Sequence, residues 1–247
     1  MNQIDNKQIY DQHWQLWTDM KLYGPASRWL RQLIGEILNE IPSSQINSIL
    51  DVGCGEGSTT QFIAHKLSNA LVRGIDFSEA GIECANSQWK LNNLEFQYEP
   101  NSDSLKNQWD IVCAFEVIEH IENWQEVLNQ MANSSQKYLI LSFPTGRMRP
   151  FEAHMGHFRN FKKNEVEDFL SSRSFLPKKI FYAGFPFYSP LYRELCNLTN
   201  AGSNQFVQGK YGISQKIVSS VLYFLFRFMS TKRYYGDQFC GLFERVE

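Results

Sequence analysis

Three glycines directly after an apolar run constrain the fold of this 247-residue chain more than any other feature. Residues 48–52 (SILDV) predict a buried β-strand, and GCGEG at 53–57 predicts a sharp turn into a helix that begins near Thr59. A simple turn needs one or two glycines, because each further glycine costs about 0.5 to 1 kcal/mol relative to alanine in regular structure. We therefore expect a ligand to approach this backbone closely.

Short apolar strands alternate with helices through the middle of the chain. The expected strands are 48–52, 71–75, 94–98, 110–115 and 138–143, and the expected helices are 59–67, 79–91 and 124–131. Strands that are apolar on both faces and alternate with helices are typical of a parallel sheet covered on both sides. A helix at 164–171, a strand at 179–182 and a final strand in DQFCGLFERV extend the pattern.

Two segments fall outside this alternation. Apolar residues recur at helical spacing between residues 8 and 40, interrupted by Gly24 and Pro25, which predicts two helices before the first strand. Residues 184–235 break the rhythm and include an amphipathic run at 217–229. We interpret the chain as one domain. Its expected parts are an N-terminal helical cap (1–45), a core (46–183), an insertion or lid (184–235) and a last strand (236–247).

Composition narrows the expected setting of the protein. With 24 basic and 26 acidic residues, the chain lacks the broad positive surface of a nucleic-acid-binding protein. Its five cysteines are scattered and form no C-x-x-C pair, which favours reduced thiols over disulfides. The polar N-terminus does not resemble a secretion signal, and the run at 217–229 is too short to cross a bilayer of about 30 Å. We expect a cytoplasmic protein without a transmembrane segment.

The glycine loop lies where open α/β sheets bind ligands, at the carboxyl end of a strand. Its spacing is G-x-G-x-G, so a dinucleotide, which prefers G-x-G-x-x-G, is the weaker fit. The N-terminus of the following helix favours an anionic ligand group. Asp76 ends the next strand, where a carboxylate can accept both hydroxyls of a ribose, and Phe77 can face a purine. Alternatively, Asp76 caps the helix that begins near Glu79.

The segments ILDVGCGEG, GIDFS and WDIVCAFEVIEHIENWQEVL, in this order and spacing, resemble the motifs of class I S-adenosylmethionine-dependent methyltransferases of the small-molecule type. The resemblance covers residues 48–143. It implies an α/β fold with a Rossmann-like, seven-stranded, mostly parallel sheet, helices on both faces and an antiparallel last strand. It also implies S-adenosyl-L-methionine (SAM) as cofactor and S-adenosyl-L-homocysteine (SAH) as product.

The same resemblance assigns cofactor roles to residues at the strand ends. The residues expected at the methionine part are Asp51, Gly53, Gly55 and Gly57, with Asp76 on the ribose and Phe77 lining the adenine pocket. The candidates for the adenine amine follow the third strand and are Asn101, Ser102 and Asp103. The residues expected to flank the methionine chain and the sulfonium are Phe115, Glu116 and Val117.

Methyl transfer from a sulfonium is an in-line displacement, so the protein mainly has to position the acceptor and exclude water. An oxygen or nitrogen acceptor must also lose a proton, for which histidine is a suitable base. The loop FPTGRMRPFEAHMGHFRNF offers His154 and His157, and FEVIEH offers His120. Alternatively, these histidines are hydrogen-bonded parts of the scaffold.

Three arginines of the same loop are candidates to anchor an acidic group of the acceptor, because guanidinium groups match carboxylate or phosphate. They are Arg147, Arg149 and Arg159; the alternative is a solvated surface. We expect no metal, since Glu152, His154 and His157 come from one loop without a distant partner.

The acceptor is expected to be a small molecule from a biosynthetic pathway. Tyr23 and Trp17 from the helical cap are candidate substrate contacts, and the aromatic run FYAGFPFYSPLY and the segment after Ile213 are candidates for the acceptor pocket. Two alternatives stay open. The chain could act on a lipid-linked or glycan acceptor at a membrane surface, or bind SAM as a module without catalysis. The sequence specifies neither the acceptor nor the oligomeric state.

Overall fold

A single seven-stranded sheet organises the chain, as seen in a computed structural model that describes residue 14 and residues 18–199 and 209–246. The strand order is β3-β2-β1-β4-β5-β7-β6. The strands are β1 (Ser48–Val52), β2 (Leu71–Asp76), β3 (Leu94–Tyr98), β4 (Trp109–Phe115), β5 (Ser135–Pro144), β6 (Phe175–Ala183) and β7 (Gln238–Arg245). β7 runs antiparallel to β5 and β6, and the other neighbouring strands are parallel. The expected fold class is confirmed.

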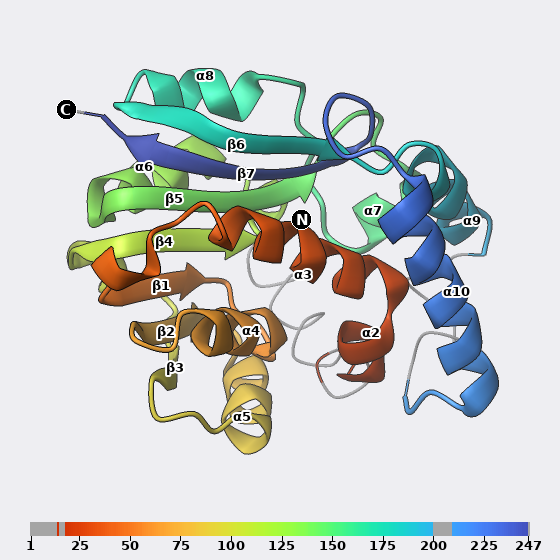
Figure 1. Cartoon of the computed structure of the whole chain (residues 1–247), viewed down its shortest axis with the longest axis horizontal. Helices are drawn as coiled ribbons and strands as arrows, with labels where there is room; N and C mark the ends of the chain where they lie inside the picture. The colour runs from red at the N-terminus through yellow and green to blue at the C-terminus, as the bar shows by residue number, and fades with distance from the viewer. Residues whose placement is uncertain (1–13, 15–17, 200–208, 247) are drawn as a thin grey trace.

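Helices cover both faces of the sheet (Figure 1). The α-helices are α2 (Thr18–Tyr23), α3 (Pro25–Leu38), α4 (Ser58–Lys66), α5 (Glu79–Gln88), α6 (Trp124–Ser134), α7 (Pro150–His154), α8 (Glu165–Ser171), α9 (Arg193–Leu198) and α10 (Ile213–Met229). Short 3-10 turns are η1 (Ser43–Gln45), η2 (Asp103–Lys106) and η3 (Ile118–His120), and η4 (Phe187–Tyr192) is π-helical. The arrowheads of the parallel strands point towards the end where α2, α7, α9 and α10 lie (Figure 1).

Alternation along the central strands divides the core into two layers. Ile49 of β1 lies beside Ile111 of β4, and both pack with α3 and α4 on one face. The next pair, Leu50 and Val112, packs with α6 and α8 on the other face. Because successive side chains point to opposite faces, a strand that is apolar throughout supplies both layers at once.

The strand–helix rhythm of the sequence closely matches the observed elements. β1 and β3 have the expected bounds, and β2, β4 and the helices between them differ only at their ends. β6 begins at Phe175, earlier than expected, and α7, η4 and α9 were not expected. No helix among the described residues is long and apolar enough to cross a membrane.

The glycine loop, residues 53–57, has a left-handed backbone at every glycine. The φ angles are +73° at Gly53, +55° at Gly55 and +82° at Gly57. A Cβ atom would lie 2.3 Å from the Trp14 ring at Gly55 and 2.5 Å from the Phe96 ring at Gly57. The protein's own side chains pack closely against Gly55 and Gly57, so backbone geometry and packing both require these glycines.

We predict that Gly57→Ala lowers the free energy of unfolding by about 2 to 4 kcal/mol. The alanine would be strained in the left-handed backbone conformation, and its methyl group would also clash with the Phe96 ring. Gly209→Ala is the matched control, since Gly209 has φ +75° but open space around the added carbon. It should cost only about 1 kcal/mol. Urea unfolding of both variants measures the difference, and equal losses would show that packing against Phe96 contributes nothing.

Candidate active site

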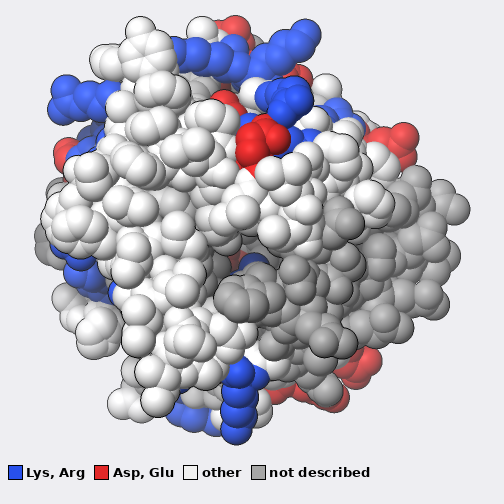
Figure 2. Space-filling view, turned by 90° about the vertical axis from the view of Figure 1, so that its right-hand side faces the viewer, with Lys and Arg blue, Asp and Glu red and all other residues white. Residues whose placement is uncertain are grey.

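A cavity of about 300 Å³ lies at the carboxyl ends of β1, β4 and β5. Figure 2 looks onto this end of the molecule and shows a hollow near the centre of the face. The lining includes Asp51, Gly53, Cys54, Glu56, Ser58 and Thr59 around the glycine loop, and Phe115, Glu116 and His120 after β4. It also includes Trp14, Lys21 and Arg31, with Met155, His157, Tyr188, Tyr192, Arg193 and Gln238. Its volume is at the lower end of the usual range for ligand sites.

Asp76 connects the end of β2 to the glycine loop. Its carboxylate accepts hydrogen bonds from the backbone amides of Gly55 and Ser78, each at 2.8 Å. The side chain of Ser78, and not that of Asp76, caps α5 by accepting from the amide of Gly81 at 3.1 Å. The structure therefore disagrees with the helix-cap alternative. Asp76 is buried and is not among the residues that line the cavity.

A glutamate side chain of the protein itself lies at the N-terminus of α4. Glu56 is buried, and its carboxylate accepts from the amide of Ser58 at 3.1 Å and from the Ser58 hydroxyl at 2.6 Å. We expected an anionic ligand group at this helix end. Glu56 occupies the amide of Ser58, while Ser58 and Thr59 line the cavity, so a ligand group at this helix end stays a prediction.

Asp51 is a buried acid at the end of β1 that faces the cavity. Its carboxylate accepts a 2.6 Å hydrogen bond from the hydroxyl of Thr60 on α4 and a longer contact from the Cys113 thiol. Burial raises the pKa of Asp51 to about 7. A cationic ligand group beside it would favour the ionised form.

Glu116 at the end of β4 has a strained backbone and a well-held side chain. Its φ is +58°, which a non-glycine residue adopts at a cost of about 1 to 3 kcal/mol, usually at functional sites. The carboxylate accepts from Ser142 Oγ and Gln238 Nε2, each at 2.8 Å, and burial raises its pKa. Phe115 lines the cavity beside it, whereas Val117 does not and instead packs against Gly53.

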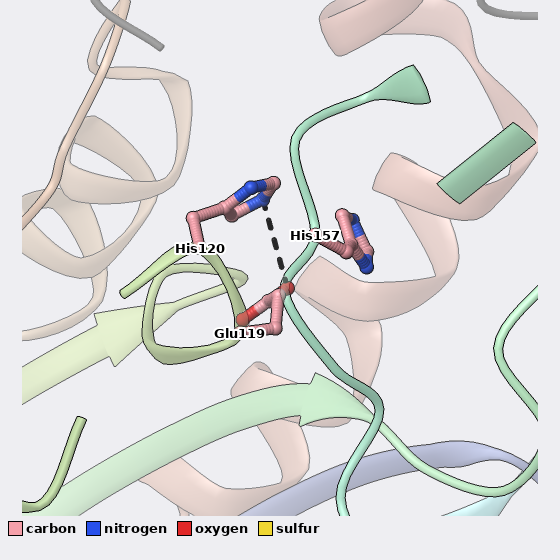
Figure 3. Close-up of side chains that lie close together, drawn as sticks. All are labelled: Glu119, His120 and His157. Atoms are coloured by element: carbon pink, nitrogen blue, oxygen red, sulfur yellow. Dashed lines mark ion pairs between the residues drawn. The ribbon is translucent and has the colours of Figure 1, made fainter. Parts of the chain in front are cut away.

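Two of the three candidate histidines meet at the cavity wall. His120 on η3 and His157 from the loop after α7 lie edge to face, with ring centroids 4.5 Å apart. Figure 3 shows the Glu119 carboxylate beside the two rings, with its Oε1 4.0 Å from His120 Nε2. Burial lowers the pKa of His120 to about 3 and of His157 to about 4, so both imidazoles are neutral near pH 7.

His154 lies elsewhere. It is exposed, its Nδ1 is 2.7 Å from the carbonyl oxygen of Pro150, and it is not part of the cavity lining. His154 lies four residues after Pro150, about one helical turn along α7, so its ring contacts its own helix and does not reach the cavity. Of the two histidines in the loop, the structure brings only His157 to the cavity.

The three predicted arginine anchors lie outside the cavity. Arg149 is buried and donates to Glu194 at 2.8 Å, with Asp237 at 3.7 Å. Arg147 is exposed and pairs with the same glutamate, while Arg159 donates to the Glu122 carbonyl at 2.8 Å. Their donors hold the loop together, so the expectation that they face the acceptor disagrees with their placement.

Other cations line the cavity instead. Arg193 of α9 is buried in an ion pair with Glu152, and Asp237 lies 3.5 Å from it. Lys21 of α2 and Arg31 of α3 also face the cavity. Because Arg193 is already neutralised by carboxylates, Lys21 is the better placed of these cations to meet an anionic group of a ligand.

The remaining predicted residues lie at the edges of the site. Asn101 and Asp103 are exposed, Ser102 and Phe77 are half-buried, and none of the four lines the cavity. Their turn nevertheless begins beside Asp76, since the amide of residue 99 donates to the Asp76 carbonyl at 2.9 Å. Tyr23 is exposed, with the Lys216 ammonium 4.3 Å from its ring centroid, and Trp17 lies outside the described residues.

Several site residues had no specific signal in the sequence. The aromatic run does reach the cavity, through Tyr188 and Tyr192. Arg193, Cys196 and Gln238 come from elements without a catalytic motif, and no spacing pattern could have identified them. Glu56 could have been found, because an acid two residues before a helix is a frequent N-terminal partner.

Comparisons with known proteins agree with this architecture. Residues 50–135 match the family described as a methyltransferase domain. The malonyl-acyl-carrier-protein O-methyltransferase of Acetivibrio thermocellus is 24% identical over 167 residues, which are 66% of this chain and 58% of that protein. The ubiquinone biosynthesis O-methyltransferase of Rickettsia canadensis is 31% identical over 124 residues, 49% of this chain and 52% of that protein. The chain thus spans little more than half the length of these relatives.

Solved structures share the fold over the whole chain. The magnesium protoporphyrin IX methyltransferase of Synechocystis PCC 6803 with bound SAM matches with a TM-score of 0.58, 16% identity and 100% coverage of both chains. The plantazolicin methyltransferase BpumL, in complex with a triazolic desmethylPZN analog and SAH, matches with a TM-score of 0.56, 17% identity and the same coverage. At this level of identity the likeness concerns the fold.

Proposed function

We propose that this chain, whose residues 50–135 match a methyltransferase domain, is a class I S-adenosylmethionine-dependent methyltransferase that methylates an oxygen atom of a small-molecule acceptor. One observation carries the proposal: a single cavity joins Asp51 and the glycine loop to a pair of neutral imidazoles and to aromatic side chains. The O-methyltransferase names of the relatives favour oxygen over nitrogen.

In the proposed complex the cofactor lies along the carboxyl ends of β1, β2 and β4. Asp51 and Glu116 face the cationic methionine end, because both carboxylates are buried in the cavity wall. Asp76 receives the ribose hydroxyls, which requires its carboxylate to exchange a backbone partner for the sugar. The turn at 101–103 lies beyond Asp76, where the adenine is expected.

The acceptor occupies the other end of the same cavity. Tyr188 and Tyr192, supplied by the segment 184–235, provide an apolar wall there, which supports a lid role for that segment. His120 and His157 stand at this end as proton acceptors. When the acceptor oxygen attacks the methyl carbon, the new C–O bond forms as the C–S bond breaks. The hydroxyl proton leaves to a base, and SAH is the product.

We predict that Asp76→Ala weakens SAM binding at least about tenfold, because the variant lacks the acceptor of the ribose hydroxyls and leaves the Gly55 amide without its partner. Asp168→Ala is the control, since Asp168 is an exposed aspartate of α8 that does not line the cavity. Titration calorimetry with SAM and SAH measures both variants, and circular dichroism checks their fold. Equal affinity of the Asp76 variant and the unmodified protein would disprove the ribose assignment.

We predict that His157→Ala slows methyl transfer by about a hundredfold or more while SAM affinity changes little, as expected for loss of a group that assists deprotonation. His154→Ala should leave turnover unchanged, because that ring lies outside the cavity. Transfer of a labelled methyl group to a panel of hydroxylated small molecules provides the assay. SAM binding without transfer to any acceptor, together with full stability of both variants, would favour a non-catalytic SAM-binding module.

A second candidate function, methylation of a lipid-linked acceptor at a membrane surface, is favoured by the outer face of α10. Its exposed apolar residues are Ile213, Ile217, Val218, Val221, Phe224, Phe228 and Met229. No acidic residue occurs between Glu194 and Asp237, whereas five lysines and arginines do. Figure 2 shows a broad uncharged area on this end of the molecule with basic side chains at its margins. Such an apolar face with basic neighbours suits an anionic bilayer.

The second function predicts that the protein sediments with vesicles of phosphatidylcholine mixed with phosphatidylglycerol, and less with phosphatidylcholine alone. The double variant Phe224→Ser and Phe228→Ser should lose this binding. Leu71→Ser, at an exposed apolar position on the edge strand pair β2–β3, should keep it. Sedimentation that is unaffected by the double variant would exclude α10 as the membrane contact.

A further inference from the structure

A buried carboxylate lies close to two imidazoles that line the cavity. Glu119 and His120 belong to η3 after β4, and His157 comes from the loop after α7, so two distant segments contribute (Figure 3). One ligand atom from each residue lies within 4.8 Å of the others. This supplies the distant partner that the loop lacked in the sequence, although Glu152 and His154 are not part of the set.

Glu119 is poorly satisfied for a buried acid. Its side chain is fully buried, and neither carboxylate oxygen has a hydrogen-bond partner in the described part of the chain. His157 Nδ1 is buried and also lacks a partner there. Lys21 lines the same cavity, but no ion pair between described residues joins it to Glu119. A buried polar group without a partner is destabilising, and more so when it is charged. These atoms therefore point to a ligand that the protein itself does not provide.

The donor set identifies the chemical class of that ligand. Two imidazole nitrogens and one carboxylate oxygen are ligands of divalent first-row metals such as zinc, which takes them at about 2.0 to 2.2 Å. Ligand atoms around such an ion lie about 3.4 Å apart in tetrahedral geometry. Side-chain rotations would have to bring these atoms closer together by up to about 1.4 Å. The two imidazoles are neutral and can coordinate without first losing a proton.

We infer that Glu119, His120 and His157 form a binding site for a divalent first-row transition-metal ion at the acceptor end of the cavity. Three protein ligands leave a position for an acceptor hydroxyl, as in catalytic metal sites. The ion lowers the pKa of that hydroxyl, so that its proton passes to water, and His120 and His157 then hold the ion in place of the proton-acceptor role proposed above. The resulting oxyanion forms the C–O bond as the C–S bond of the donor breaks. This inference rests on the proposed methyl transfer and specifies its substrate as an acidic hydroxyl.

The test begins with metal-free protein and Zn²⁺ or Co²⁺ as the probe. We expect one ion per chain by elemental analysis and calorimetry, and visible d–d absorption of bound Co²⁺ that reports nitrogen and oxygen ligands. Glu119→Gln and His157→Ala should each weaken binding at least about tenfold. His65→Ala, which alters an exposed histidine of α4, should bind like the unmodified protein. Binding that is equally strong in all four proteins, or no binding at the site, overturns the inference.

Measurements of stability distinguish a metal-binding role of Glu119 from a structural role. Without metal, Glu119→Gln should be at least as stable as the unmodified protein, because it removes a buried carboxyl that lacks partners. With Zn²⁺, only the unmodified protein should gain melting temperature. A loss of stability in metal-free Glu119→Gln, with no metal effect on either protein, would assign Glu119 a structural role. SAM calorimetry on the same metal-free samples keeps the two proposals distinct, since SAM binding without metal binding removes only the metal site.

Discussion

The attachment of the glycine loop to the sheet is the interaction on which the site depends. Asp76 at the end of β2 holds the amides of Gly55 and Ser78, and the Gly53 amide bonds to the Ile75 carbonyl at 2.8 Å. These bonds fasten the end of β1 to the end of its neighbour β2 and aim α4 away from the strand ends. The space above β1 and β4 is left for a ligand because the chain turns back so sharply, which only a left-handed backbone allows.

The second property of the site is that several carboxyl groups are buried without an opposite charge to pair with among the residues that the structure describes. Asp51, Glu116 and Glu119 are carboxyl groups whose pKa is raised by burial, and they stand at the ends of β1 and β4. Such groups are costly in an empty protein and become favourable when a cation arrives. A sulfonium cofactor at Asp51 and Glu116, and a metal ion at Glu119, would each provide one. The burial of these carboxyl groups would then both lower the stability of the empty protein and strengthen the binding of a cation.

The charged loop after β5 shows where reasoning from sequence fails. Its arginines and histidines are close in sequence and looked equally able to face a ligand. In the structure, Arg149 holds Glu194, and Arg193 from α9 holds Glu152, so these buried charges stabilise the loop itself. A buried charge needs a partner more than an exposed one does, and the partner comes from an element distant in sequence. His157, in the loop after α7, reaches the cavity, whereas His154 at the end of α7 folds back to the Pro150 carbonyl of its own helix.

The sequence by itself determined the sheet, the glycine turn and the family of motifs, because strand periodicity and glycine spacing are local properties of the chain. The last antiparallel strand followed from the resemblance. Only the tertiary structure decided which polar groups share a cavity. The pairing of Glu119 with His157, the contribution of Gln238 to Glu116, and the wall formed by Tyr188 all join segments far apart in sequence. Such contacts depend on how helices and loops pack across strand ends, which no local pattern encodes.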